Sequence, residues 1–525
     1  MTGVKLIARE EWRMLARNRS GLIATGLLVL LLLVAGFTSL ESRSAIEADR
    51  TRYQASVDET FDAQPDRHPH RMVHYGQFLF RPIAPLAFFD AGVNSFTGNT
   101  IFLEGHRQNS ANFAEARQSS LLLRFGQLTP AFILQTLAPL LLIFLAFASV
   151  AREKERATLK LLLAQGIGGR SLIAGKMLGH GAIALAVGLP AFALLLGFAA
   201  TGAADWATVG VMIIAYACWL LLWAFASVII SALVARPRDA LAILMGLWMI
   251  TIILLPRALP EAASAQNQLA TKIETEIALH RDLLEIGDSH DPDDPYFNDF
   301  RDEVLDRYGV RTVEELPVQY AGLVAIEGER LTTQIYADAA QRQAAREREQ
   351  NAFVHTFSVL SPLIAIRQLS MTLAGSDPAA HQDFLDQSEA FRYEFVQRLN
   401  RMQAELLPGI GGEDPRISAA YWQEVPRFSY SPFNPLADGT RIIWPLLVLA
   451  GWQRSACWLS LPLAASEESH DEPFPLALAC RSTSLAALEP QCLGSDPAAG
   501  PFCGVSLVRH SSGAGSTRNN RTGPA

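Results

Sequence analysis

The chain has 525 residues, of which 50% are hydrophobic and 18% are charged, and its formal net charge is −8. The charged fraction is below the roughly 25% of soluble globular domains, and the apolar residues stand in long blocks, which excludes an ordinary soluble protein. Acidic residues gather between Glu261 and Glu413, and no basic surface indicates nucleic acid as a partner. The composition therefore predicts an all-α integral membrane protein embedded in a lipid bilayer.

The first 20 residues are basic and lie directly before an uncharged apolar block at 21–40. Leu6, Trp12 and Met14 are interspersed among the basic residues, so residues 1–20 are expected to form an amphipathic helix on the membrane surface. The block at 21–40 is long enough to cross the hydrocarbon core and too long for a cleavable signal peptide. The basic flank predicts a cytoplasmic N-terminus at the plasma membrane, the inner membrane of a bacterium.

Further apolar blocks predict transmembrane helices at 129–150, 181–201, 208–235 and 239–256. Between the first two spans, residues 41–128 are polar and are expected to form an extracytoplasmic domain. Residues 151–180 then form a short loop on the cytoplasmic side. The basic residues of this loop, which support the orientation, are Arg152, Lys154, Arg156, Lys160, Arg170 and Lys176.

Residues 257–440 are polar again and predict a second, mostly helical extracytoplasmic domain. One apolar stretch within it, at 357–366, fits either contact with the membrane or packing in a protein core. The next apolar run, at 441–465, begins like a sixth span but contains Gln453 and Arg454, so an incomplete span is expected. The predicted architecture is thus about six transmembrane helices with two extracytoplasmic insertions.

The last segment, 466–525, shows no periodicity and is rich in Cys, Ser, Gly and Pro, which predicts an unstructured tail. Two explanations fit it. A shifted reading frame near Trp452 would account for an apolar run that stops halfway across the membrane. A natural disordered tail after an arginine-containing span is the alternative, and sequencing the coding DNA distinguishes the two.

The chain contains no motif of an ATPase or of another enzyme. The nearest match to a phosphate-binding loop is Gly175-Lys176, which is followed by Met177 and has Arg170 where the first glycine is required. No ionisable residue lies deep in the five spans, which argues against a proton- or ion-coupled pathway. The chain is therefore expected to bind no cofactor and to carry out no hydrolysis itself.

The loop at 151–180 contains the run Arg-Glu-Lys-Glu-Arg-Ala-Thr-Leu-Lys-Leu-Leu-Leu from Arg152 to Leu163. Mixed charges precede leucines at i, i+3 and i+4 spacing, which predicts one short amphipathic helix whose leucines form an exposed stripe. Such a helix could rest on the membrane surface or dock a cytoplasmic partner. The spacing alone leaves both interpretations open.

This run, the basic start of the chain and the later Arg170…Gly175-Lys176 resemble the E-x-E-x-G-T-L…R…G-K loop of the ABC-2 type permeases. The resemblance is to the branch with a DUF3526 outer domain, related to the permease of the exporter that serves copper-site maturation of nitrous oxide reductase. It spans about residues 1–450. It departs at Ala157, where the family usually has Gly, at Gly166, where Pro is commoner, and throughout the tail.

The resemblance implies the permease subunit of an ATP-driven exporter. Such a subunit pairs with a second permease copy or a paralogue, and it docks separate ATP-binding subunits, which hold the ATP and Mg. The residues then expected to contact the ATPase are Glu153, Glu155, Arg156, Thr158, Leu159, Leu162 and Leu163. The rival hypothesis is a non-transporting membrane anchor whose extracytoplasmic domains bind or sense a periplasmic partner.

The first extracytoplasmic segment is rich in histidine. Its H-Y-G and E-x-H patterns resemble signatures of the same family and comprise His70, His74, Tyr75, Gly76, Glu104 and His106. Imidazole and carboxylate groups suit Zn or Cu, so His70, His74 and His106 are potential metal ligands. Their spacings match no compact ligand set, and a structural hydrogen-bonding role is favoured, with no metal assigned.

Overall fold

The computed structural model divides the chain into two units, Met1–Asp471 and Glu472–Ala525. The residues that it describes are 2–109, 128–287, 291, 293–409, 415–432, 434–437 and 439–466. Of the predicted tail only Ser466 belongs to this set, so the prediction of an unstructured tail concerns residues outside it. Part of the predicted domain at 41–128 likewise lies outside the described residues.

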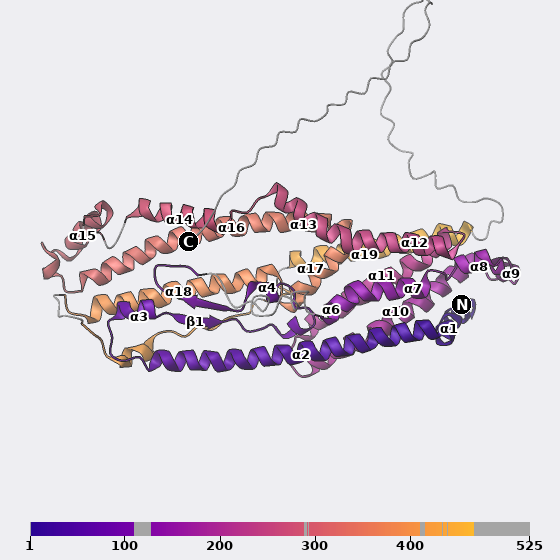
Figure 1. Ribbon diagram of the computed structural model, residues 1–525, viewed down its shortest axis with the longest axis horizontal. Coiled ribbons are helices and arrows are strands. Elements are labelled where there is room, and N and C mark those ends of the chain that lie inside the picture. The colour runs from indigo at the N-terminus through magenta and orange to yellow at the C-terminus, as the bar shows by residue number, and fades with distance from the viewer. Residues whose placement is uncertain are drawn as a thin grey trace, which may run out of the picture. The chain divides into compact units, whose positions relative to one another are not determined.

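Among the described residues, five helical segments are long and apolar enough to cross a membrane. They are α2 (Arg19–Asp62), the segment Pro130–Glu155, α10 (Gly169–Ala200), α11 (Trp206–Leu233) and the segment Pro237–Gln266. Each overlaps one of the five uninterrupted apolar blocks in the sequence, and the predicted all-α membrane class is confirmed. Figure 1 shows these helices running alongside one another in the unit Met1–Asp471.

Helix α2 extends far beyond its apolar block. Its 44 residues correspond to about 66 Å, roughly twice the hydrocarbon thickness of a bilayer. Asn18 caps the start, since its side chain accepts a hydrogen bond from the Gly21 amide at 3.1 Å. No Gly or Pro lies between Gly36 and Pro65, so nothing interrupts the helix where the sequence turns polar. The second half of α2 therefore projects into the first insertion.

Two of the spans contain a π-turn just before a proline. In the second span, α6 (Pro130–Phe132), η3 (Ile133–Leu137) and α7 (Ala138–Ala146) lead to α8 (Ala151–Glu155). The fifth span consists of α12 (Pro237–Trp248), η4 (Met249–Leu254) and α13 (Leu255–Gln266). Pro139 and Pro256 lack amide protons, which favours the wider turn. Side chains satisfy the carbonyls there: Trp219 Nε1 donates to Leu134 O at 3.0 Å and Ser361 Oγ donates to Thr251 O at 2.6 Å.

The first insertion holds α3 (Pro69–Tyr75), β1 (Gln77–Phe80), η1 (Pro85–Phe88), α4 (Asn94–Thr97) and β2 (Thr100–Leu103). The strands pair antiparallel, with Gln77 opposite Leu103 and Phe80 opposite Thr100. The remaining elements are α14 (Lys272–Ile286), α15 (Pro295–Tyr308), η5 (Val313–Glu315), α16 (Tyr320–Thr356), η6 (Phe357–Val359), α17 (Pro362–Ala374), α18 (Pro378–Leu406), η7 (Ala419–Glu424) and α19 (Gly439–Ser466).

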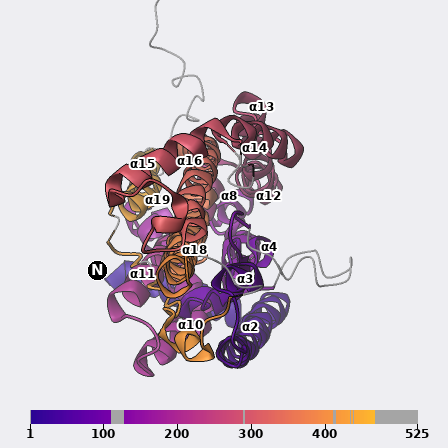
Figure 2. The ribbon, with the colours of Figure 1, turned by 90° about the vertical axis from the view of Figure 1, so that its left-hand side faces the viewer.

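The two insertions share one hydrophobic core. Phe61, Met72 and Leu79 of the first insertion are buried in the same cluster as Phe384 and Phe395 of the second. Figure 2 shows α3 beside α18, in agreement with their contacts. The sequence treats these segments as two separate domains because four predicted spans lie between them, whereas the structure joins them in one folded body.

Helix α17 packs on the transmembrane bundle, although it belongs to the second insertion. Leu363, Ile366 and Leu369 are buried in the core that the spans form. Core packing therefore accounts for the second half of the apolar stretch at 357–366, whereas Val359 and Leu360 in its first half are 49% and 54% exposed. Helix α19 runs from Gly439 to Ser466 without a break at Gln453 or Arg454 and packs against α11 and α17.

Candidate functional site

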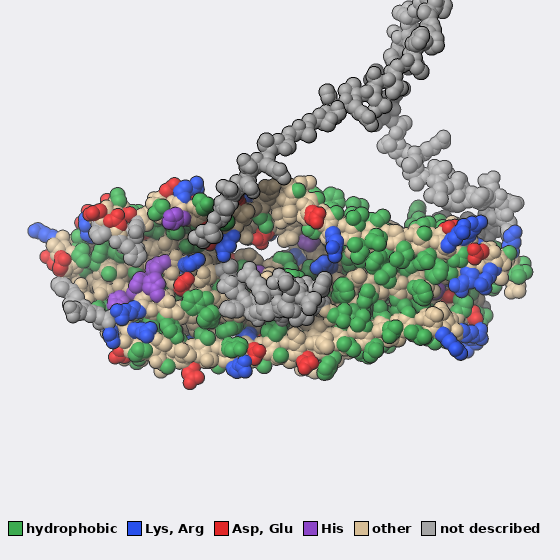
Figure 3. Space-filling model, viewed as in Figure 1, with side chains coloured by type: hydrophobic (Ala, Val, Ile, Leu, Met, Phe, Trp, Pro, Cys, Tyr) green, Lys and Arg blue, Asp and Glu red, His purple; other side chains and the backbone are tan. Residues whose placement is uncertain are grey.

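Basic side chains gather at one end of the transmembrane bundle, on α1 (Thr2–Arg17), α8, α9 (Thr158–Ala164) and the start of α12. We call these elements the basic end. Figure 3 shows its Lys and Arg side chains beyond the apolar band that covers the spans. They include Lys5, Arg9, Arg13, Arg152, Lys154, Arg156, Lys160, Arg236 and Arg238.

Helix α1 lies directly against α10 because α10 has glycines where the two helices meet. A Cβ atom at Gly175 would lie 2.7 Å from Ile7 Cβ, and one at Gly179 would lie 2.9 Å from Glu11 Cβ. Both distances are too short for a side chain. The Gly-x-x-x-Gly spacing puts both glycines on one face, which permits this close approach of two helices.

A buried ionic cluster reinforces this contact. Lys176 Nζ lies 2.7 Å from Glu11 Oε1 and 2.7 Å from Glu153 Oε1, while His180 Nε2 lies 3.1 Å from Glu11 Oε2. A buried lysine is tolerated only when it is paired, and here the two carboxylates come from α1 and α8. Burial opposes ionisation of Glu11, but hydrogen bonds and positive charge from His180 and Lys176 outweigh it and lower its pKa. The cluster therefore ties α1, α8 and α10 together.

This geometry corrects the expectation for Glu153. The sequence assigns Glu153 to an ATPase contact, but its side chain is only 21% exposed and pairs with Lys176 inside the protein. Gly175 and Lys176 hold α1 in place, a role that the sequence alone did not indicate. The glycine spacing and the i, i+4 pair Lys176 and His180 are local signals of a helix interface, but their partner Glu11 is 165 residues away from Lys176.

The predicted single amphipathic helix is two short helices. Helix α8 ends at Glu155 and α9 begins at Thr158, with Ala157 between them at φ +58°. This left-handed conformation favours glycine and costs another residue about 1–2 kcal/mol. It explains why glycine is usual at this position in the family that the loop resembles, and it breaks the helical periodicity expected across 152–163.

The break changes which side chains are exposed. Leu159 is only 7% exposed, Leu162 and Leu163 are half-buried, and Leu161 is 63% exposed. The predicted exposed stripe of Leu159, Leu162 and Leu163 is therefore wrong, because Leu159 packs into the protein itself. Glu155, Arg156 and Thr158 are exposed, as docking residues must be.

The exposed turn between α8 and α9 is anchored to the bundle through helix α11. Ser231 Oγ of α11 accepts hydrogen bonds from the amides of Val150 and Ala151, each at 3.0 Å. These are amides at the start of α8 that have no partner within the helix. Lys154 Nζ donates to the Ala232 carbonyl at the end of α11. Helix α8 is thus fixed to α11 as well as to α1 and α10.

A cavity of about 650 Å³ opens beside this turn, between α1, α7, α8 and α10. Its lining includes Arg152, Arg156 and Thr158 as well as Glu11, Glu153 and His180. The ionic cluster therefore borders a space that the exposed turn also reaches.

A second polar cluster lies where the first insertion meets the bundle. Asp90 is 8% exposed and accepts a hydrogen bond from Ser370 Oγ of α17, while Gln135 Nε2 donates to the Tyr216 hydroxyl at 2.8 Å. Tyr216 in turn shares a hydrogen bond of 2.8 Å with Ser370. Burial raises the pKa of Asp90. The sequence did not reveal this cluster, because Asp90 lies outside the spans and its partners are far away along the chain.

The histidine motif of the first insertion converges in the structure. His70 and His74 lie on α3, and His106 follows β2; one ligand atom from each lies within 4.8 Å of the others. Tyr75 ends α3, and Gly76 at φ +69° allows the chain to turn, since a Cβ there would lie 2.3 Å from Leu103 O. Glu104 does not join the histidines, because its Oε1 accepts a hydrogen bond from Asn109 Nδ2 at 3.2 Å.

Comparison with known families agrees with this architecture. Residues 99–268 match the family model described as ABC-2 family transporter protein, and residues 272–431 match a domain of unknown function, DUF3526. No curated protein matches the chain. The first match covers the second to fifth spans, which defines a multi-pass membrane permease. The chain is an ABC-2 permease with a DUF3526 domain, whereas the narrower relation to the nitrous oxide reductase system stays a prediction.

Proposed function

We propose that this permease is the membrane-spanning subunit of an ATP-driven exporter and that a separate ATP-binding subunit docks on its basic end. The observation that carries the proposal is the exposed turn of Glu155, Arg156 and Thr158, which the buried cluster around Lys176 holds in place. The match to the ABC-2 family supports it, as does the absence of a phosphate-binding loop in this chain. ATP and Mg would bind in the partner.

The charge distribution supports a cytoplasmic location for the basic end. Lys and Arg are enriched in cytoplasmic loops of membrane proteins, and the basic residues of α1, α8 and α9 lie together at one end. Leu6 and Trp12 of α1 are 66% and 42% exposed, which suits a helix that also rests on the membrane surface. The N-terminus would then lie on the cytoplasmic side of the plasma membrane.

The same contacts suggest how a partner's movement would reach the membrane. Helix α8 is bonded to α11 through Ser231 and to α10 through the pair of Glu153 with Lys176, and Lys176 also pairs with Glu11 of α1. A push on the turn would therefore move four elements rather than one loop. Two permease chains with two ATPases would complete the exporter, by the family's usual assembly. The charged side chains would fix the register of docking, as electrostatic complementarity does at other interfaces.

The test is a charge reversal, Glu155→Arg together with Arg156→Glu, in the permease expressed with its ATP-binding subunit. We expect a loss of ATPase co-purification and of stimulated ATP hydrolysis, because like charges placed opposite each other at an interface cost several kcal/mol. Membrane insertion should be unchanged, since both side chains are exposed.

The matched control reverses another exposed neighbouring pair, Arg301→Glu with Asp302→Arg on α15. It should leave co-purification intact. Normal recovery of the complex with the variant at 155 and 156 would contradict docking at this turn and would favour the anchor hypothesis.

A further inference from the structure

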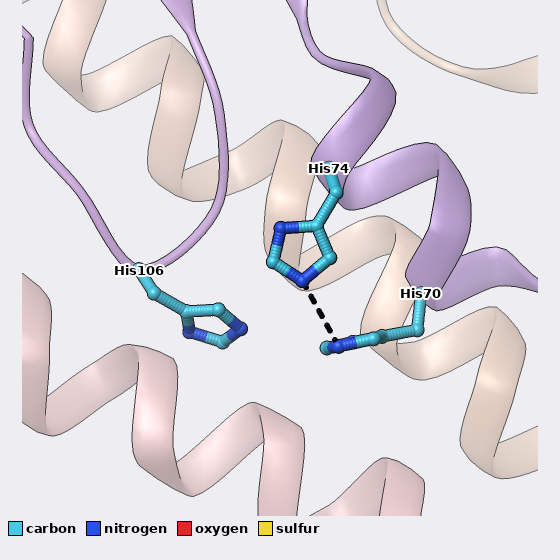
Figure 4. A group of neighbouring side chains, drawn as sticks. All are labelled: His70, His74 and His106. Carbon is cyan, nitrogen blue, oxygen red and sulfur yellow. Dashed lines mark hydrogen bonds between the residues drawn. The ribbon is translucent and has the colours of Figure 1, made fainter.

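The three converging histidines have the geometry of metal ligands. His70 and His74 are four residues apart on α3, which places both rings on one face of the helix, and their Nε2 atoms lie 3.1 Å apart. The His106 ring faces them from the loop after β2, with ring centroids 5.7 Å from His70 and 5.6 Å from His74. Figure 4 shows the three rings directed toward a common space.

His106 is held in position by the DUF3526 domain. Glu329 of α16, whose side chain is fully buried, accepts a hydrogen bond from the His106 amide at 2.9 Å, and His106 Nδ1 lies 3.3 Å from the same carboxylate oxygen. A carboxylate at Nδ1 fixes the proton there and leaves the Nε2 lone pair for a metal, an arrangement usual around metal-binding histidines. His106 and Ala157 are the two non-glycine residues with positive φ in the described part of the chain.

Glu329 is itself anchored. Its Oε1 accepts a hydrogen bond from Arg392 Nη1 and another from Thr333 Oγ1 at 3.0 Å. Arg392 of α18 also pairs with Glu389 at 2.7 Å and donates to Thr333 Oγ1 at 2.7 Å. The carboxylate is therefore held by side chains of α16 and α18, so the orientation of the His106 ring is built into the fold.

Helix α3, which carries the other two histidines, is held close to the His106 loop. Gly105 lets the loop approach α3, since a Cβ there would lie 2.2 Å from Val73 Cγ1. Helix α3 is capped by His68, whose Nδ1 accepts a hydrogen bond from the His70 amide at 3.2 Å, and it packs against α18. Segments that are far apart in the sequence thus bring three imidazoles together.

We propose that His70, His74 and His106 form a binding site for Zn²⁺ or an ion of the same class. At Zn–N distances of about 2.0–2.1 Å, tetrahedral ligand atoms lie about 3.4 Å apart. The pair His70 and His74 is already at this separation, and rotation of the exposed His74 side chain can shorten the longer separations, none of which exceeds 4.8 Å. Three imidazoles leave a fourth position on the solvent side for water or another ligand. The ion would join α3 to the loop after β2 within the first insertion, and the contact of His106 with Glu329 would link it to the DUF3526 domain.

The test uses the full-length permease, purified without a histidine tag in lipid nanodiscs and titrated calorimetrically with Zn²⁺. We expect one Zn²⁺ per chain. His74→Ala and His106→Asn should each weaken binding by about tenfold or more; Asn is chosen because it tolerates positive φ. The control His280→Ala removes an exposed histidine of α14 and should bind like the unchanged protein. Zn²⁺ should also raise the melting temperature of the unchanged protein and of the control, but not of the two site variants.

A second measurement identifies the ligands independently of affinity. Co²⁺ bound in place of Zn²⁺ should give the visible absorption of a tetrahedral nitrogen-ligated ion, and His74→Ala should abolish it. A folded permease that takes up no Zn²⁺ would overturn the proposal. Equal affinity in the unchanged protein and both site variants would overturn it as well, and the histidines would then serve as a hydrogen-bonding cluster only.

Discussion

Two regions of this permease share one ionic arrangement, a buried cation between two carboxylates with a histidine beside them. The arrangement has a different role in each region. At the basic end, Lys176 lies between Glu11 and Glu153 with His180 beside them. In the folded body that the two insertions form, Arg392 lies between Glu329 and Glu389 with His106 beside them. The first histidine side chain is 6% exposed, whereas the second is 25% exposed and faces two further imidazoles.

The difference lies in what each histidine can still contact. His180 is enclosed by the helices that its cluster joins, so that cluster fastens α1 to the bundle. His106 uses one nitrogen on Glu329 and presents its ring to His70 and His74. A buried cation between two carboxylates can therefore fasten helices together, or it can orient a ligand for a neighbouring site. Removing each cation separately tests this contrast.

The largest effect is expected from Arg392→Met. Its guanidinium is 1% exposed and its loss would leave two carboxylates buried without a cation, which typically costs about 3–5 kcal/mol. SDS-induced unfolding in mixed micelles measures this change. Arg330→Met is the matched control on α16, where the pair with Glu327 is partly exposed, and should cost less than about 1 kcal/mol. A comparable loss in both variants would show that the cluster around Arg392 is not a special source of stability.

A smaller loss is expected from Lys176→Met at the basic end. Its partner Glu153 is 21% exposed and borders the cavity of about 650 Å³, so we expect a loss below the roughly 3 kcal/mol that a fully enclosed pair would give. The same unfolding assay compares the two variants directly. A loss larger than that of Arg392→Met would reverse the contrast drawn between the two clusters.

Acidic pH should have the smallest effect, a local loosening of α1. Because the pKa of folded Glu11 lies below its usual 4.5, its contribution is complete above that pH and is lost as the pH falls through the lowered pKa. Spin labels at Arg13→Cys and Leu178→Cys should show a wider distance distribution in acid. Glu11→Gln should remove this pH dependence. A distribution that does not change with pH in the unchanged protein would mean that the Glu11 carboxylate does not hold α1.

The sequence predicted the elements that depend on local patterns. Apolar blocks of membrane-spanning length are contiguous, so five spans could be placed from composition alone. The ionic clusters could not be predicted, because Glu11 and Lys176 are 165 residues apart and His106 and Glu329 are 223 apart. His70, His74 and His106 could be named as potential ligands from the sequence, but their spacings match no compact ligand set, and only the fold brings His106 opposite the i, i+4 pair His70 and His74.

The placement of the basic end in the cytoplasm is the central claim, since docking of an ATP-binding subunit depends on it. Its most direct test is labelling with a membrane-impermeant maleimide, in spheroplasts, of a cysteine-free permease that carries either Arg156→Cys or Arg342→Cys. Both positions are exposed on the protein surface. We predict that position 342 reacts from outside and that position 156 reacts only after the membrane is permeabilised. Labelling of position 156 in intact spheroplasts would contradict the account.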